Sequence, residues 1–180
     1  ATEIWHEGIR LPVLKLVEGG RVRDDLRKLL LLNSRTADLL DGDLRAMLGS
    51  VAIGAERIEA LVAELGLASY LDHLQGICDH ADRRFRGAIA ALPDGRYEAV
   101  ERSDNDCFGP ADVHVDVAVT VAGDELCVDF TGSCEQIRGF KNSSLANTYS
   151  AVYMALSSFF DPDLPRNEGT YRAVRIVAPE

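Results

Sequence analysis

The sequence predicts an α+β fold: an antiparallel helical hairpin, and a small, mainly antiparallel sheet with a helix packed on it. Apolar residues recur at helical spacing through residues 43–92 and 145–160, whereas from 112 to 130 they alternate with polar residues. The first pattern makes one stripe of a helix apolar, and the second makes one face of a strand apolar. With 47% hydrophobic residues among 180, the chain can bury a core.

Residues 1–23 are expected to be an irregular lead-in, because turn-forming residues interrupt them (Gly8, Pro12, Gly19 and Gly20). A short helix should begin at Asp24, where an acidic residue suits the positive end of the helix dipole, and end at Leu32. Residues 33–41 are interpreted as a connection.

Residues 24–92 form the predicted helical region, which contains two long apolar stripes. The first starts near Asp43 and ends before Gly66, a helix-stop residue, and the second runs from Leu67 to Leu92. The short break between them predicts an antiparallel hairpin of helices.

Residues 93–180 form the predicted mixed region. A turn at 93–95 precedes a strand over 96–102 and a polar, flexible loop over 103–111. The valines from Val113 to Val121 should form the apolar face of a strand, which returns after Gly123 through Leu126–Phe130. A helix over 145–160 should cover that face, and a last strand should span 171–178. The absence of an initial Met and the stop after a strand-like run lead us to expect part of a larger subunit.

Charge and cysteine content exclude several classes of protein. The formal net charge of −10 disfavours binding to nucleic acid or to an anionic membrane surface. No apolar run approaches the roughly 20 residues that span a bilayer. The four cysteines are scattered, which is typical of reduced thiols in the cytoplasm rather than of a disulfide framework.

Few residues qualify as catalytic or metal-binding. His73 and His80 are two helical turns apart, roughly 10 Å, which is too far for one metal ion. Asp129, Thr131 and Asn142 lie at or near the turn after the hairpin and are weak catalytic candidates. They could equally cap that turn and the next helix, and we favour the structural interpretation. We assign no cofactor-binding and no metal-binding residue to this chain.

Several separated stretches together resemble the hydantoinase B/oxoprolinase family. They occur in the family's order along essentially the whole chain: residues 2–4, 7–12, 15–16, 33–36, 42–46, 92–98, 129–132, 139–142, 150–153 and 165–169. The chain departs from the family pattern at Ala37, where Pro is common, and at Lys141, where a small apolar residue is common.

The resemblance implies a B-type subunit that works with, or is fused to, a hydantoinase A type partner. The partner binds ATP and activates a carbonyl oxygen by phosphorylation. Family reactions open cyclic amides such as hydantoins and oxoproline, and related complexes carboxylate ketones such as acetone or acetophenone. In the family, His and Asp ligands of a divalent metal lie in a segment that would precede Ala1.

We therefore expect a fragment of an ATP-dependent cyclic amide hydrolase that opens hydantoin- or oxoproline-like rings. Two alternatives stay open. One is a subunit of a ketone carboxylase, and the other is a non-catalytic assembly domain. We expect the isolated chain to be inactive, because no catalytic constellation is complete within it.

Overall fold

The computed structural model describes residue 6 and residues 8–179, and the chain divides into two compact units at Tyr70 and Leu71. Helices and a small mixed sheet confirm the α+β class. Part of the resemblance to the family lies outside the described residues, namely residues 2–4 and Glu7. The predicted division of the chain into regions 1–23, 24–92 and 93–180 stays a prediction.

The first unit contains a short hairpin that the sequence did not predict. Strand β1 (Val17–Glu18) pairs antiparallel with β2 (Arg21–Val22) around Gly19 and Gly20, whose φ angles are 57° and 74°. Two consecutive positive φ angles suit glycine and make a tight hairpin turn. The prediction of an irregular lead-in was therefore wrong at residues 17–22. Strands of two residues are too short to show an alternating pattern in the sequence.

Helix α1 (Asp24–Leu32) appears as predicted, but α2 (Ala37–Leu65) begins earlier than Asp43. The segment 33–41, predicted to be a connection, is therefore helical from Ala37 onward. Its polar residues lie on a side of α2 that forms ion pairs. Arg27 Nε lies 2.6 Å from Asp41 Oδ1, and Arg45 pairs with the other oxygen of Asp41. The helix ends as expected at Gly66, where φ is 79°.

Helix α3 (Leu67–Ile89) follows and ends three residues before Leu92, in a turn. The packing of α2 against α3 as a hairpin stays a prediction.

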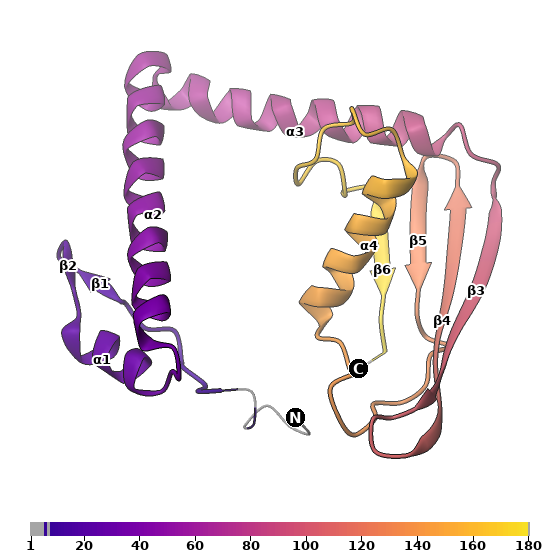
Figure 1. Cartoon of the computed structure of the whole chain (residues 1–180). Helices are drawn as coiled ribbons and strands as arrows, with labels where there is room; N and C mark the ends of the chain where they lie inside the picture. The colour runs from indigo at the N-terminus through magenta and orange to yellow at the C-terminus, as the bar shows by residue number, and fades with distance from the viewer. Residues whose placement is uncertain (1–5, 7, 180) are drawn as a thin grey trace. The chain divides into compact units, whose positions relative to one another are not determined.

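The second unit is built on a four-stranded sheet with the order β3-β4-β5-β6. Its strands are β3 (Gly95–Asn105), β4 (Pro110–Ala122), β5 (Glu125–Asp129) and β6 (Val174–Val177). All neighbours are antiparallel except β5 and β6, which are parallel. Helix α4 (Leu145–Phe159) lies on one face, as predicted, and the last turns of α3 lie at one end of the sheet (Figure 1).

The predicted flexible loop over 103–111 was wrong, because the ladder between β3 and β4 continues to Asn105 and Pro110. Only four residues remain as a turn. The carboxylate of Asp106 closes it by accepting hydrogen bonds from the backbone N–H groups of Phe108 and Gly109, both at 2.9 Å. These two bonds lower the pKa of Asp106.

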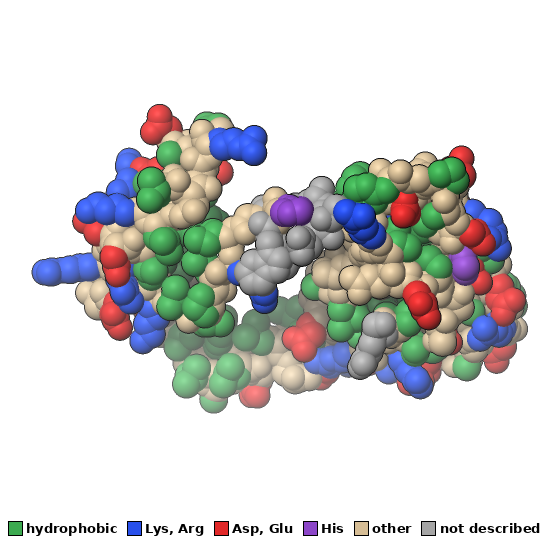
Figure 2. Space-filling view, turned by 90° about the horizontal axis from the view of Figure 1, so that it is seen from below, with side chains coloured by type: hydrophobic (Ala, Val, Ile, Leu, Met, Phe, Trp, Pro, Cys, Tyr) green, Lys and Arg blue, Asp and Glu red, His purple; other side chains and the backbone are tan. Residues whose placement is uncertain are grey.

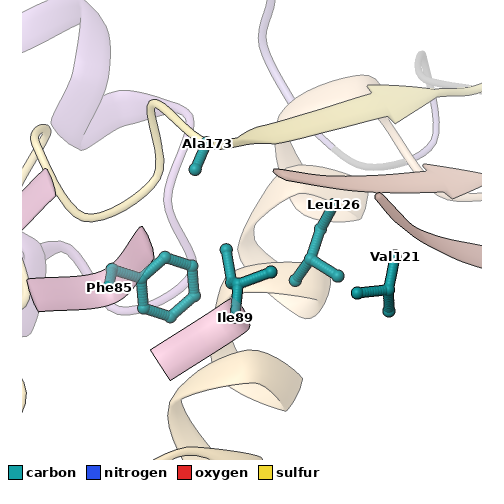
Figure 3. Close-up of a cluster of buried hydrophobic side chains, with 5 residues drawn as sticks. All are labelled: Phe85, Ile89, Val121, Leu126 and Ala173. Atoms are coloured by element: carbon teal, nitrogen blue, oxygen red, sulfur yellow. The ribbon is translucent and has the colours of Figure 1, made fainter. Parts of the chain in front are cut away.

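A small core joins α3 to the sheet. Five buried side chains converge in Figure 3, and they come from α3, β4, β5 and the segment before β6: Phe85, Ile89, Val121, Leu126 and Ala173. Phe160 packs edge-on against Phe85, with ring centroids 4.9 Å apart. This cluster stabilises the end of the sheet nearest α3.

The segment after α4 holds α3 by close backbone contact. A Cβ on Gly169 would overlap the carbonyl group of Cys78, so only glycine fits there. Next to this contact Arg172 pairs with Asp79 of α3 at 2.7 Å, and Tyr171 stacks on Tyr153 of α4. Turns at 169–174 delay β6 to Val174, later than the predicted start at 171.

All four cysteines are free thiols, as expected. Within the described part of the chain, no helix is both long and apolar enough to cross a membrane.

Candidate functional site

The second unit carries a large groove between the sheet and α4, with a volume of about 1670 Å³. Its floor is the valine face of β4 together with Leu126, Val128 and Phe130. Its wall is the apolar side of α4, which includes Ala151, Ala155 and Phe159. The alternation in the sequence therefore predicted the correct apolar face, and the helix covers that face as expected.

Coverage of the valine face changes along β4. Val121 is 4% exposed beside the α3 core, Val117 and Val119 are half-buried, and Val115 is 48% exposed. At the core end of the groove, Phe159 is 70% exposed although it lies against the core residue Phe160. The core face predicted from sequence is therefore buried at one end and open at the end near the β3–β4 turn.

Polar residues gather at one part of the groove, in the segment between β5 and α4. Thr131, Ser133, Glu135, Gln136 and Asn142 line it there. They form a polar rim beside an apolar interior, an arrangement that is common in binding sites.

Asn142 has its side chain committed to the loop itself. Its Nδ2 donates to the carbonyl oxygens of Ile137 and Gly139 at 2.6 and 2.8 Å, and its Oδ1 accepts from the N–H of Ile137 at 3.0 Å. The amide is thus well satisfied without a ligand.

Asp129 and Thr131 bind each other. Asp129 Oδ1 accepts hydrogen bonds from the N–H and the hydroxyl of Thr131, at 2.8 and 2.5 Å. These bonds, with smaller contributions from the charges of Arg96 and Arg175, lower the pKa of Asp129. Thr131 lines the groove, whereas Asp129 lies on the outer face of β5. All three candidates are thus engaged in local hydrogen bonds, and a catalytic role for any of them stays a prediction.

Lys141, one of the departures from the family pattern, holds two loops together. Its Nζ donates to Ser103 Oγ at 2.6 Å and to the carbonyl and side-chain oxygens of Asn105 at 2.7 and 2.9 Å. Nearby, Arg138 lies over the ring of Phe108 at 4.9 Å. The loop before α4 is therefore attached to the β3–β4 turn.

Two polar residues of β4 were not selected from sequence. His114 Nδ1 and Asp116 Oδ1 are buried and have no hydrogen-bond partner among the described residues. The backbone around them is paired: Cys134 N–H donates to the His114 carbonyl, and Ser133 Oγ bonds the backbone of Asp116. In the sequence, these two residues could be noticed only because they occupy polar positions of the alternating strand.

The described residues do not assemble a metal centre. No group of three or more His, Cys, Asp or Glu side chains comes close enough to hold an ion in the described part of the chain. The metal ligands that the resemblance implies before Ala1 stay a prediction.

Comparison with known proteins identifies the family. The model of the family described as hydantoinase B/oxoprolinase matches residues 1–180. The chain belongs to the hydantoinase B/oxoprolinase family. This confirms the resemblance that the short motifs indicated.

Two relatives within the hydantoinase B/oxoprolinase family are similar over nearly all of this chain. The beta subunit of the caprolactamase of Pseudomonas jessenii is 33% identical, over 98% of this chain and 30% of its own. A protein of Pseudomonas sp. strain NS671 that is named as the B component of a D-/L-hydantoinase is 30% identical, over 100% of this chain and 32% of its own. The chain thus spans about a third of the length of these relatives.

Two solved structures share the fold. The ATP-dependent caprolactamase from Pseudomonas jessenii superposes with a TM-score of 0.91 and 32% identity, covering 100% of this chain and 31% of that one. The nucleotide-free acetone carboxylase superposes with a TM-score of 0.83 and 18% identity, covering 94% of this chain and 24% of that one. In both structures the fold is embedded in a much longer chain.

Proposed function

We propose that this chain is part of the B-type subunit of an ATP-dependent cyclic amide hydrolase that acts with an ATP-binding, A-type partner. The observation that carries the proposal is the similarity to ATP-dependent caprolactamase over the whole chain, at 32% identity and a TM-score of 0.91. The substrate is a small cyclic amide of the hydantoin or oxoproline kind. We retain a cytoplasmic location as a prediction.

The chemistry starts on the partner. Transfer of the γ-phosphoryl group of ATP to the amide oxygen releases ADP and makes the amide carbon more electrophilic. Water then adds to that carbon and the ring C–N bond breaks, with the nitrogen leaving as an amine or urea group and an acyl phosphate remaining. A second water hydrolyses the acyl phosphate to a carboxylate and phosphate. The products are an open-chain amino acid or its carbamoyl counterpart, ADP and phosphate.

The role of residues 1–180 in this reaction is to shape the subunit. The three candidate polar residues are occupied by local hydrogen bonds, and the described residues hold no metal cluster. The unit instead provides a rigid sheet, a firmly attached loop before α4 and an apolar groove. Our proposal is that bond making and breaking take place in the rest of the complex.

A ketone carboxylase subunit is the second candidate function. The acetone carboxylase structure supports it through the fold alone, because identity is 18%. An assembly domain without any role in substrate binding is the third candidate, and the open apolar groove favours it.

Coexpression of a subunit carrying these residues with the neighbouring A-type gene tests the proposal. ADP release should rise on addition of caprolactam, hydantoin or 5-oxoproline, with ring-opened product found by mass spectrometry. Release that rises only with acetone or acetophenone plus bicarbonate would establish the carboxylase instead. A stable complex that turns over neither class would favour the assembly domain.

A further inference from the structure

We propose that the open half of the groove between β4 and α4 is an internal docking surface, covered by an apolar segment of the same subunit that lies outside these 180 residues. The inference rests on family membership and not on the cyclic amide activity. It concerns which surface the rest of the subunit needs, and its test does not require turnover.

The size of the groove argues against a small molecule as its main occupant. Pockets for drug-sized ligands are typically about 300–1,000 Å³, and the rings considered above are smaller than such ligands. The groove measures about 1670 Å³. A helix about 10 Å across would need roughly 20 Å of its length to fill that volume, which is three to four turns.

The chemistry of the open half calls for an apolar partner. Val115 is 48% exposed, and Val113 and Val117, which are half-buried, lie on the same side of β4. Hydrophobic side chains also interrupt the charged surface of the molecule in the view from below (Figure 2). A row of partly exposed β-branched residues gains most from being buried against aliphatic side chains.

The valine face is continuous with an existing core. Val121 and Leu126 at one end of the same face are buried by Phe85 and Ile89. The face therefore already functions as a packing surface at one end, and the open half needs only a further covering element. A second layer on a sheet is the usual way to bury such a face.

Two observations favour a segment of the same subunit over a second copy of the chain. The relatives carry about two thirds of their length outside the matched region, since the match covers 30–32% of them. The net charge of −10 opposes the association of two identical chains. The remainder of the subunit supplies ample sequence without that repulsion.

A pair of matched valines tests the proposal. Val115 faces the groove and lies opposite Glu101, whereas Val100 is 51% exposed on the outer face and lies opposite Asp116. Val115→Lys and Val100→Lys therefore introduce the same charge at similar exposure beside an acidic neighbour. In the 180-residue chain both variants should melt within about 2 °C of the wild type.

In a subunit of the relatives' length that carries these residues, Val115→Lys should lower the melting temperature by at least about 5 °C more than Val100→Lys. Equal effects of the two substitutions in that longer subunit would overturn the proposal. So would a 180-residue chain that dimerises and becomes monomeric on Val115→Lys, because a second copy would then be the occupant. An unchanged melt with a raised KM for the cyclic amide would assign the groove to substrate.

Thiol labelling provides a test that needs no destabilised variant. Cys134 lines the groove, whereas Cys127 on β5 does not. Alkylation of Cys134 by a maleimide, followed by peptide mass spectrometry, should be at least about tenfold slower in the longer subunit than in the 180-residue chain, relative to Cys127. An unchanged ratio of the two rates would overturn the proposal.

Discussion

The two units of this chain differ in how they are stabilised. Of the ten buried hydrophobic side chains among the described residues, nine lie in the second unit and one, Leu44, lies in the first. The first unit relies on helix hydrogen bonds and on the ion pairs of Asp41 with Arg27 and Arg45. Surface ion pairs contribute little to stability, and isolated helices are marginal in water. The difference indicates that the second unit carries most of the intrinsic stability of the chain.

The largest expected effect is in the core of the second unit. Ile89 is fully buried, so Ile89→Ala should lower the free energy of unfolding by about 2–5 kcal/mol. The comparable truncation in the first unit, Met47→Ala, should cost about 0.5 kcal/mol or less, because Met47 is 56% exposed. Urea denaturation followed by circular dichroism measures both. Equal losses would contradict the proposed difference between the units.

A second test concerns the contact of Gly169 with α3. Gly169→Ala should cost about 1–3 kcal/mol, because the new Cβ meets the backbone of Cys78, which cannot move aside as a side chain can. Gly87→Ala is the matched control within α3, where a Cβ meets no atom within 4 Å. That change should stabilise by about 0.5–1 kcal/mol. The two melting temperatures should therefore move in opposite directions, and a shift of the same sign would refute the contact.

A smaller effect is expected where loops meet in the second unit. Lys141→Met removes three hydrogen bonds to Ser103 and Asn105 and should cost about 1 kcal/mol, since the site is exposed. Limited proteolysis should cut the β3–β4 turn faster in the variant. Lys28→Met, at an exposed position of α1, serves as control. No change in the cleavage pattern would show that the turn holds its shape unaided.

The smallest effect concerns pH and the first unit. The hydrogen bond from Arg27 lowers the pKa of Asp41 below its ordinary value of 3.8. A carboxylate whose pKa is lower in the folded state stabilises that state above 3.8, and this contribution is lost as the pH falls through the lowered pKa. Asp41→Asn should therefore reduce the helical signal at 222 nm at pH 7, and the difference from the wild type should shrink at acidic pH. A difference that does not vary with pH would rule out this ion pair as its cause.

Prediction from sequence succeeded where the signal is local. The positions of α1, α3, α4 and β5, and the helix stop at Gly66, follow from periodicity and from the conformational freedom of glycine. Prediction failed at Asn105 and Pro110, where pairing between β3 and β4 extends both strands into a segment that the sequence marks as a loop. It also failed at Asp41, where ion pairs accompany a polar segment that is helical.

The candidate site was predicted in part. The valine face of β4 could be assigned from alternation, but its open half could not, because burial depends on which distant segments pack there. The hydrogen bonds that occupy Asn142, Asp129 and Thr131 were considered as one of two interpretations. The buried atoms of His114 and Asp116 that lack a hydrogen-bond partner had no sequence signal beyond their place on the strand.

The sequence by itself determined the class of fold, the apolar face of the hairpin and the family, because periodicity and short motifs are properties of neighbouring residues. Only the tertiary structure decided that Gly169 must accommodate the backbone of α3, that Lys141 joins two loops, and that the valine face is covered at one end and open at the other. These are contacts between residues far apart in the chain, and they depend on packing that no local pattern records.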